Sequence, residues 1–125
     1  MSVDGIYFTK EHEWIRVNGD EVMVGITDHA QAELGDIVFV EIETLGENLK
    51  QGDVFGSIEA VKTVSDLFMP ASGGVTEVNE AIADSPELIN NDPFGEGWLI
   101  RLRLDDPAEL DSLLDAAQYK AQLES

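Results

Sequence analysis

The chain contains no cysteine and few basic residues. Its 125 residues carry 26 acidic side chains against 7 basic ones, for a formal net charge of −19. Without cysteine the chain can form no disulfide, no thiolate nucleophile and no cysteine-ligated metal site. An electrostatic field of this sign repels nucleic acids and anionic membrane surfaces. We therefore expect no nucleic-acid or membrane partner, and any redox chemistry must come from a bound group.

Long apolar runs are also missing. No segment approaches the length of a membrane span, and the N-terminus has no basic region followed by an apolar stretch. The length suits one hydrophobic core. We expect a single domain over residues 1–125, monomeric and cytoplasmic. Two explanations of the acidic charge stay open, because it suits basic protein partners and equally a host cytoplasm rich in salt.

Recognised catalytic motifs are absent as well. No glycine pattern cradles a phosphate, and no glycine-flanked elbow frames a serine nucleophile. The two histidines, His12 and His29, belong to no recognisable metal motif. A structural or partner-facing role for His12 is favoured over a role as general base. We therefore expect a non-catalytic protein without a metal site.

The patterns that are present predict a mainly β protein. Alternating and β-branched segments predict strands at 7–9, 14–17, 22–26, 37–42, 54–59, 63–69, 75–78 and 98–104. Turn and cap residues predict a hairpin at Asn18-Gly19, a helix from Thr27 or Asp28 to Leu34, a short helix at 86–90 and a C-terminal helix from Pro107. In that last helix Leu110, Leu113, Leu114, Ala117 and Ala121 are expected to form one apolar stripe.

A strand, a glycine-containing turn and a strand precede Lys62, and the same order follows it with an insertion. This quasi-two-fold repeat predicts two small antiparallel sheets, closing as a flattened barrel or sandwich with Lys62 at the seam. Lys62 is one of four lysines and lies at the expected bend between two strands. This position suits a lysine that carries a covalently attached group and extends into water from a rigid bend in the backbone. A gatekeeper lysine that protects a strand edge is the alternative.

Five segments carry a family resemblance across nearly the whole chain. They are YFTKEHEW, VGITDHAQAELGDIVFVEI, SIEAVKTVSD, MPASGGVTEVNEAI and DSPELINNDPFGEGWLIRL. Together they closely resemble the H-protein family of the glycine cleavage system. The resemblance implies a barrel-sandwich hybrid of β-strands with short connecting helices and a C-terminal helix. It also implies lipoic acid in amide linkage to Lys62, the residue that fits the E-x-V-K segment.

The implied function is that of a non-catalytic shuttle. The P protein would load the aminomethyl group of glycine onto the lipoyl arm, the T protein would take it, and the L protein would reoxidise the arm. A lipoate ligase or a lipoyl/octanoyl transferase would attach the arm. The absence of cysteine fits this function, because a nearby thiol could exchange with the lipoyl disulfide.

The resemblance also implies a cleft that shelters the loaded arm. A cationic amine held there favours a carboxylate or a carbonyl as its partner. Matching positions make Glu13, Ser65 and Asp66 the candidates, followed by His12 and Trp14. The alternative for each is ordinary surface solvation or, for Trp14, burial in the core.

Three rival functions stay open. A biotinyl domain or the lipoyl domain of a 2-oxoacid dehydrogenase would be a smaller carrier, and biotin attachment favours methionines where this chain has Val61 and Thr63. A lipoate relay protein would share the same sequence features as the shuttle. An acidic binding module without any modification would leave Lys62 as an ordinary surface residue.

Overall fold

The computed structural model describes residues 5–19 and 21–123, which form nine strands and several short helices. The strands are β1 (Ile6–Phe8), β2 (Glu13–Asn18), β3 (Glu21–Ile26), β4 (Ile37–Glu41), β5 (Asn48–Leu49), β6 (Val54–Ala60), β7 (Val64–Phe68), β8 (Gly73–Val78) and β9 (Ile100–Leu104). The helices are α1 (Asp28–Leu34), α2 (Ala81–Asp84), α3 (Leu88–Asn91), the 3-10 helix η1 (Pro107–Ser112) and α4 (Ala116–Leu123). No helix in these two ranges is long and apolar enough to cross a membrane.

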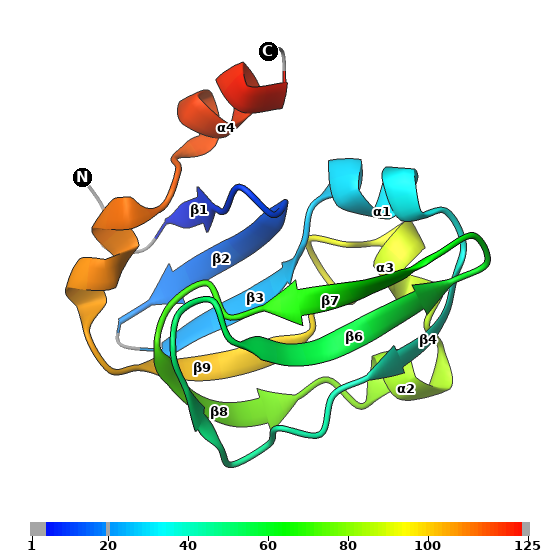
Figure 1. Ribbon diagram of the computed structural model, residues 1–125, viewed down its shortest axis with the longest axis horizontal. Helices are drawn as coiled ribbons and strands as arrows, with labels where there is room; N and C mark the ends of the chain where they lie inside the picture. Colours follow the sequence, from blue (N-terminus) through cyan, green and yellow to red (C-terminus); the bar gives the residue numbers. More distant parts are fainter. Residues whose placement is uncertain (1–4, 20, 124–125) are drawn as a thin grey trace.

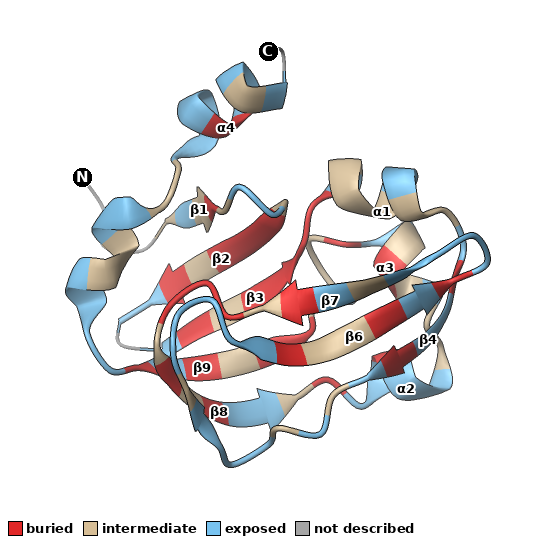
Figure 2. Ribbon diagram, in the orientation of Figure 1, coloured by how far each residue is buried: buried red, intermediate tan, exposed pale blue. Residues whose placement is uncertain are grey.

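The strands form two antiparallel sheets (Figure 1). One has six strands in the order β1-β2-β3-β9-β8-β5, and the other has three in the order β4-β6-β7. One cluster of buried apolar side chains draws on both sheets, including Ile15 and Leu102 from the first and Ile58 and Leu67 from the second. Buried segments therefore recur along the strands of both sheets (Figure 2). The predicted mainly β class with two antiparallel sheets is confirmed, although the described sheets stay open and do not close into a barrel. The quasi-two-fold repeat stays a prediction.

Local sequence signals explain the first elements. The predicted hairpin joins β2 to β3, with Val17 opposite Val22 and with Gly19 in the left-handed region at φ 67°; its Asp20 lies outside the described residues. Thr27 caps α1, because its Oγ1 accepts a hydrogen bond from Ala30 N at 3.2 Å. These elements place the Glu13 end of β2 close to the start of α1.

The C-terminal segment differs from the prediction of one helix with a continuous apolar stripe. Leu114 interrupts it by pairing with Phe8, with backbone hydrogen bonds of 2.7 and 2.8 Å in the two directions. A new helix, α4, then begins after Asp115, whose side chain and backbone exchange hydrogen bonds with Gln118. Tyr119 is the buried residue of α4. The predicted stripe is therefore wrong, because backbone pairing with β1 competes with helix continuation.

Candidate functional site

Strands β6 and β7 form a hairpin (Figure 1), and Lys62 lies in the turn that joins them. Glu59 pairs with Val64, and Ala60 N donates to Thr63 O at 2.8 Å, so the ladder continues to within one residue of Lys62. The lysine side chain is exposed. The hairpin therefore presents an amine to solvent from a hydrogen-bonded base.

The loop that follows α1 supports this tip. Val61 N donates to Asp36 O at 3.1 Å. Gly35, which ends α1 at φ 81°, lies against the lysine stem: a Cβ placed on Gly35 would be 3.0 Å from Lys62 Cε. Any other residue would be strained at this φ and would push the stem aside. Glycine at this position thus serves both the helix end and the lysine.

Asn90 of α3 holds the supporting loop in place, and sequence reasoning missed it. Its Nδ2 donates to Gly35 O at 2.8 Å and to Gln31 Oε1 at 3.0 Å, while its Oδ1 accepts from Ile37 N at 2.9 Å. One side chain thereby fixes both sides of the loop that contacts Val61. The only signal in the sequence is a polar residue next to the buried Ile89, which does not reveal the partners.

A cavity of about 350 Å³ lies beside the hairpin. Its walls come from the bend before β2, from α1 and from β7. The lining residues are Glu11, His12, Glu13, Ile26, Ala30, Glu33, Leu34, Thr63, Ser65, Asp66 and Leu67. Four of the five predicted cleft residues, Glu13, Ser65, Asp66 and His12, thus line one cavity that begins at the neighbour of Lys62. Carboxylates and apolar side chains share its walls, an environment that suits a ligand with an apolar body and a cationic end.

Trp14, the fifth predicted cleft residue, does not line this cavity. Successive residues of a strand face opposite sides, so Trp14 faces away from Glu13. The indole is fully buried with Phe8 and Tyr119, and its Nε1 donates to Pro93 O at 2.9 Å. Gly25 makes room for it, because a Cβ there would be 2.5 Å from the ring. Trp14 therefore packs the second apolar cluster.

Glu13 is a carboxyl group with 2% of its surface exposed. Its Oε2 accepts a hydrogen bond from Phe68 N at 2.8 Å, which ties β2 of one sheet to β7 of the other. Burial raises the pKa of Glu13 to about 8, and the hydrogen bonds from Phe68 and Thr9 offset only part of this increase. The side chain is therefore both a link between the sheets and a proton-holding group at the cavity wall.

His12 occupies a bend at the cavity rim in a left-handed backbone conformation, with φ 66°. Its Nδ1 is 2.8 Å from the Tyr119 hydroxyl, which in turn is 2.8 Å from Thr27 Oγ1. Burial and, to a lesser extent, the nearby His29 lower the pKa of His12 below its ordinary value. Tyr119 was not predicted, because the expected C-terminal helix placed its apolar stripe elsewhere.

Comparison with known proteins gives matches over nearly the whole chain. Residues 6–125 match the family model described as glycine cleavage H-protein. The glycine cleavage system H protein of Bacteroides fragilis is 60% identical over 116 residues, covering 93% of this chain and 92% of that protein. That of Symbiobacterium thermophilum is 61% identical over 114 residues, covering 91% and 89%. A crystal structure of a glycine cleavage system H protein from Mycobacterium marinum matches with a TM-score of 0.88 at 40% identity, covering 99% of this chain and 100% of that one.

The raised pKa of Glu13 predicts a distinctive pH dependence of stability. Between its ordinary value of 4.5 and about 8, the folded protein keeps a proton that the unfolded chain has released. The contribution of Glu13 to the free energy of unfolding is therefore largest below about pH 4.5 and declines as the pH rises toward 8. We expect the free energy of unfolding of the wild type, relative to that of the Glu13→Gln variant, to fall by on the order of a few kcal/mol over this pH range. Urea unfolding at a series of pH values measures this difference. A difference that stays constant with pH would contradict the raised pKa.

Proposed function

The chain belongs to the glycine cleavage H-protein family, and from that premise we propose that it is a shuttle whose lipoyl arm is attached to Lys62. Family membership supports a lipoyl-carrier role in glycine cleavage with the P, T and L proteins as partners. In this proposal the chain passes the aminomethyl group of glycine from the P protein to the T protein and reducing equivalents to the L protein. A lipoate ligase or lipoyl/octanoyl transferase attaches the arm. The non-catalytic, monomeric and cytoplasmic character expected from the sequence stays a prediction.

The observation that carries the proposal is the way in which the backbone around Lys62 is held in place. Of the four lysines, Lys62 lies at the tip of the β6–β7 hairpin, Lys10 lies in the turn between β1 and β2, Lys50 follows β5 and Lys120 lies in α4. The backbone hydrogen bond from Val61 N to Asp36 O holds the turn that carries Lys62, and Gly35 lies against the Cε end of its side chain. An attachment enzyme can therefore approach an exposed amine that extends from a fixed backbone turn.

The surroundings of Lys62 fit a lipoyl group. A lysine stem extended by an eight-carbon acyl chain reaches on the order of 10–15 Å at ordinary bond lengths. The neighbouring cavity of about 350 Å³ falls within the range of roughly 300–1,000 Å³ common for small-molecule sites. Ile26, Ala30 and Leu67 offer apolar contacts to a hydrocarbon chain. When bound, the lipoyl group supplies the reactive disulfide that this cysteine-free chain lacks.

The residues of the cavity wall would protect the cargo between partners. Asp66 and Glu33 place carboxyl groups where a cationic amine can pair with them, and Ser65 adds a hydroxyl. A cationic amine beside Glu13 would favour the ionised form of that buried carboxyl group. Apolar walls reduce the access of water to the cargo. The chain's own contribution is thus to anchor, to shelter and to present the cargo.

Loss of the anchor should abolish carrier function. We expect Lys62→Arg, incubated with a lipoate-attaching enzyme and the P protein, to support less than about 1% of wild-type CO₂ release from glycine, because arginine offers no amine for amide formation. The matched control Lys50→Arg changes another exposed lysine and should retain wild-type activity. Activity of Lys62→Arg comparable to that of the control would refute the attachment at Lys62.

Loss of a wall carboxylate should shorten the lifetime of the cargo. Asp66→Asn removes a charge that lines the cavity, and hydrogen bonds to charged groups contribute about 1.5–3 kcal/mol. We therefore expect the loaded variant, separated from the P protein, to release ammonia and formaldehyde about tenfold faster than wild type. The control Asp111→Asn removes a charge from an exposed position outside both the cavity and the E-x-V-K segment. Equal lifetimes for the two variants would exclude Asp66 from the sheltering wall.

A further inference from the structure

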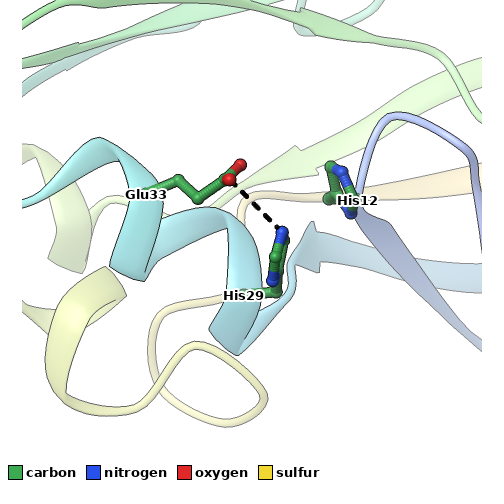
Figure 3. Close-up of side chains that lie close together, drawn as sticks. All are labelled: His12, His29 and Glu33. Carbon is green, nitrogen blue, oxygen red and sulfur yellow. Dashed lines mark ion pairs between the residues drawn. The ribbon is translucent and has the colours of Figure 1, made fainter. Parts of the chain in front are cut away.

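Three potential metal ligands lie close together (Figure 3), and two of them, His12 and Glu33, line the cavity. His12, His29 and Glu33 each offer a ligand atom, and the three atoms lie within 4.8 Å of one another. His29 Nε2 is 3.5 Å from Glu33 Oε2, and the centroids of the two imidazole rings are 4.6 Å apart. The carrier function described above assigns no role to His29, and it uses Glu33 as a wall carboxylate that can pair with the cationic cargo.

We propose that His12, His29 and Glu33 form a binding site for a divalent transition-metal ion, with Zn²⁺ as the best match. Two imidazoles and one carboxylate are a ligand set that proteins use for zinc. His29 and Glu33 are four residues apart on α1, so they project from the same face of the helix. His12 completes the set from the bend before β2.

The distances are compatible with zinc coordination. Zinc ligands at about 2.0–2.2 Å in a tetrahedral arrangement lie roughly 3.4 Å from one another. The pair from α1 already has this spacing, so only the third ligand atom has to approach. The side chains of His29 and Glu33 are 38% and 65% exposed, which leaves both free to adjust.

A hydrogen-bonded chain behind His12 orients its ring in the way that metal-bound histidines usually are. A proton on Nδ1 donated to the Tyr119 hydroxyl leaves the lone pair of Nε2 available for a metal ion. The Tyr119 hydroxyl is fixed in turn by Thr27 Oγ1, the cap of the helix that carries the other two ligands. One chain of contacts therefore links the His12 bend to α1.

The backbone of His12 is a second, independent observation. Its φ of 66° makes it the one non-glycine residue with a positive φ among the described residues. Such conformations are uncommon and concentrate at functional sites. The bend is stabilised by His12 N donating to Thr9 O and by Thr27 N donating to His12 O. The chain thus maintains an unfavourable backbone conformation at the residue that reaches the other two ligands.

Three protein ligands leave a fourth coordination position on zinc. His12 and Glu33 also line the cavity beside Lys62, so we place the open position on that side. None of the ligands is Lys62, and the site does not depend on the proposed carrier function. The sequence did not reveal it, because the third ligand comes from a separate segment and completes no recognised motif.

Titration of the metal-stripped Lys62→Arg protein with Zn²⁺ tests the site without any lipoyl group. We expect calorimetry to show one equivalent bound, and Co²⁺ to give the visible absorption bands of a tetrahedral complex with nitrogen and oxygen ligands. His12→Ala, His29→Ala and Glu33→Ala, each made in this background, should weaken binding by at least about tenfold. The control Glu59→Ala removes an exposed carboxylate elsewhere and should bind as tightly as its parent.

Tyr119→Phe gives a further readout that keeps all three ligands. Loss of the hydroxyl behind His12 should weaken Zn²⁺ binding about tenfold, as is typical when such a supporting group is removed from a metal ligand. Thermal unfolding without metal shows whether each variant folds, and the exposed Glu33 remains testable if a histidine variant does not. Absence of binding by the parent, or equal binding by the parent and the Glu33→Ala and Tyr119→Phe variants, would overturn the proposed site.

Discussion

The hydrogen bond from Ala60 N to Thr63 O is the contact on which the proposed function most depends. It closes the β6–β7 hairpin directly beneath Lys62, and the bond from Val61 N to Asp36 O attaches the same tip to the loop after α1. A lysine side chain with an attached arm is flexible along its whole length. In the proposed function, a fixed base therefore lets the attached arm return to one cavity and still reach outward.

The cavity exists because three elements from different parts of the chain meet beside this hairpin. The His12 bend, α1 and β7 each supply one wall. Glu13 joins two of them through Phe68 N, and Asn90 secures the loop at the end of the third. Burial raises the pKa of the Glu13 carboxyl group to about 8, so the ionised form of this wall residue is one that packing alone would not favour.

Eight of the nine strands in the described residues and the position of Lys62 between two of them could be predicted from the sequence because both depend on local signals, whereas the two-residue β5 was expected as a turn. Alternation marks strands, and an isolated polar tip between two of them marks a hairpin end. The outcome at the C-terminus could not be predicted in the same way, since the pairing of Leu114 with Phe8 joins two ends of the chain and competes with a good helical pattern. Asn90 and Tyr119 act through partners distant in sequence, and residue type alone does not identify those partners.

Among the cleft candidates, proximity in sequence was a poor guide to proximity in space. His12, Glu13 and Trp14 are consecutive, yet Trp14 faces a separate apolar cluster because side chains alternate along β2. Ser65 and Asp66 reach the same cavity as Glu13 only because the hairpin folds β7 toward the end of β2. The topology of the two sheets thus determines which candidates meet, while the motif identifies only which residues could take part.

The central claim is that this chain contributes an anchor and a shelter, while the reactive sulfurs belong to a group attached at Lys62. Peptide mapping by mass spectrometry of the protein isolated from lipoate-fed cells tests it most directly. The account predicts one lipoyl adduct per chain, located on the peptide that contains Lys62. An unmodified chain, or an adduct on Lys10, Lys50 or Lys120, would contradict it.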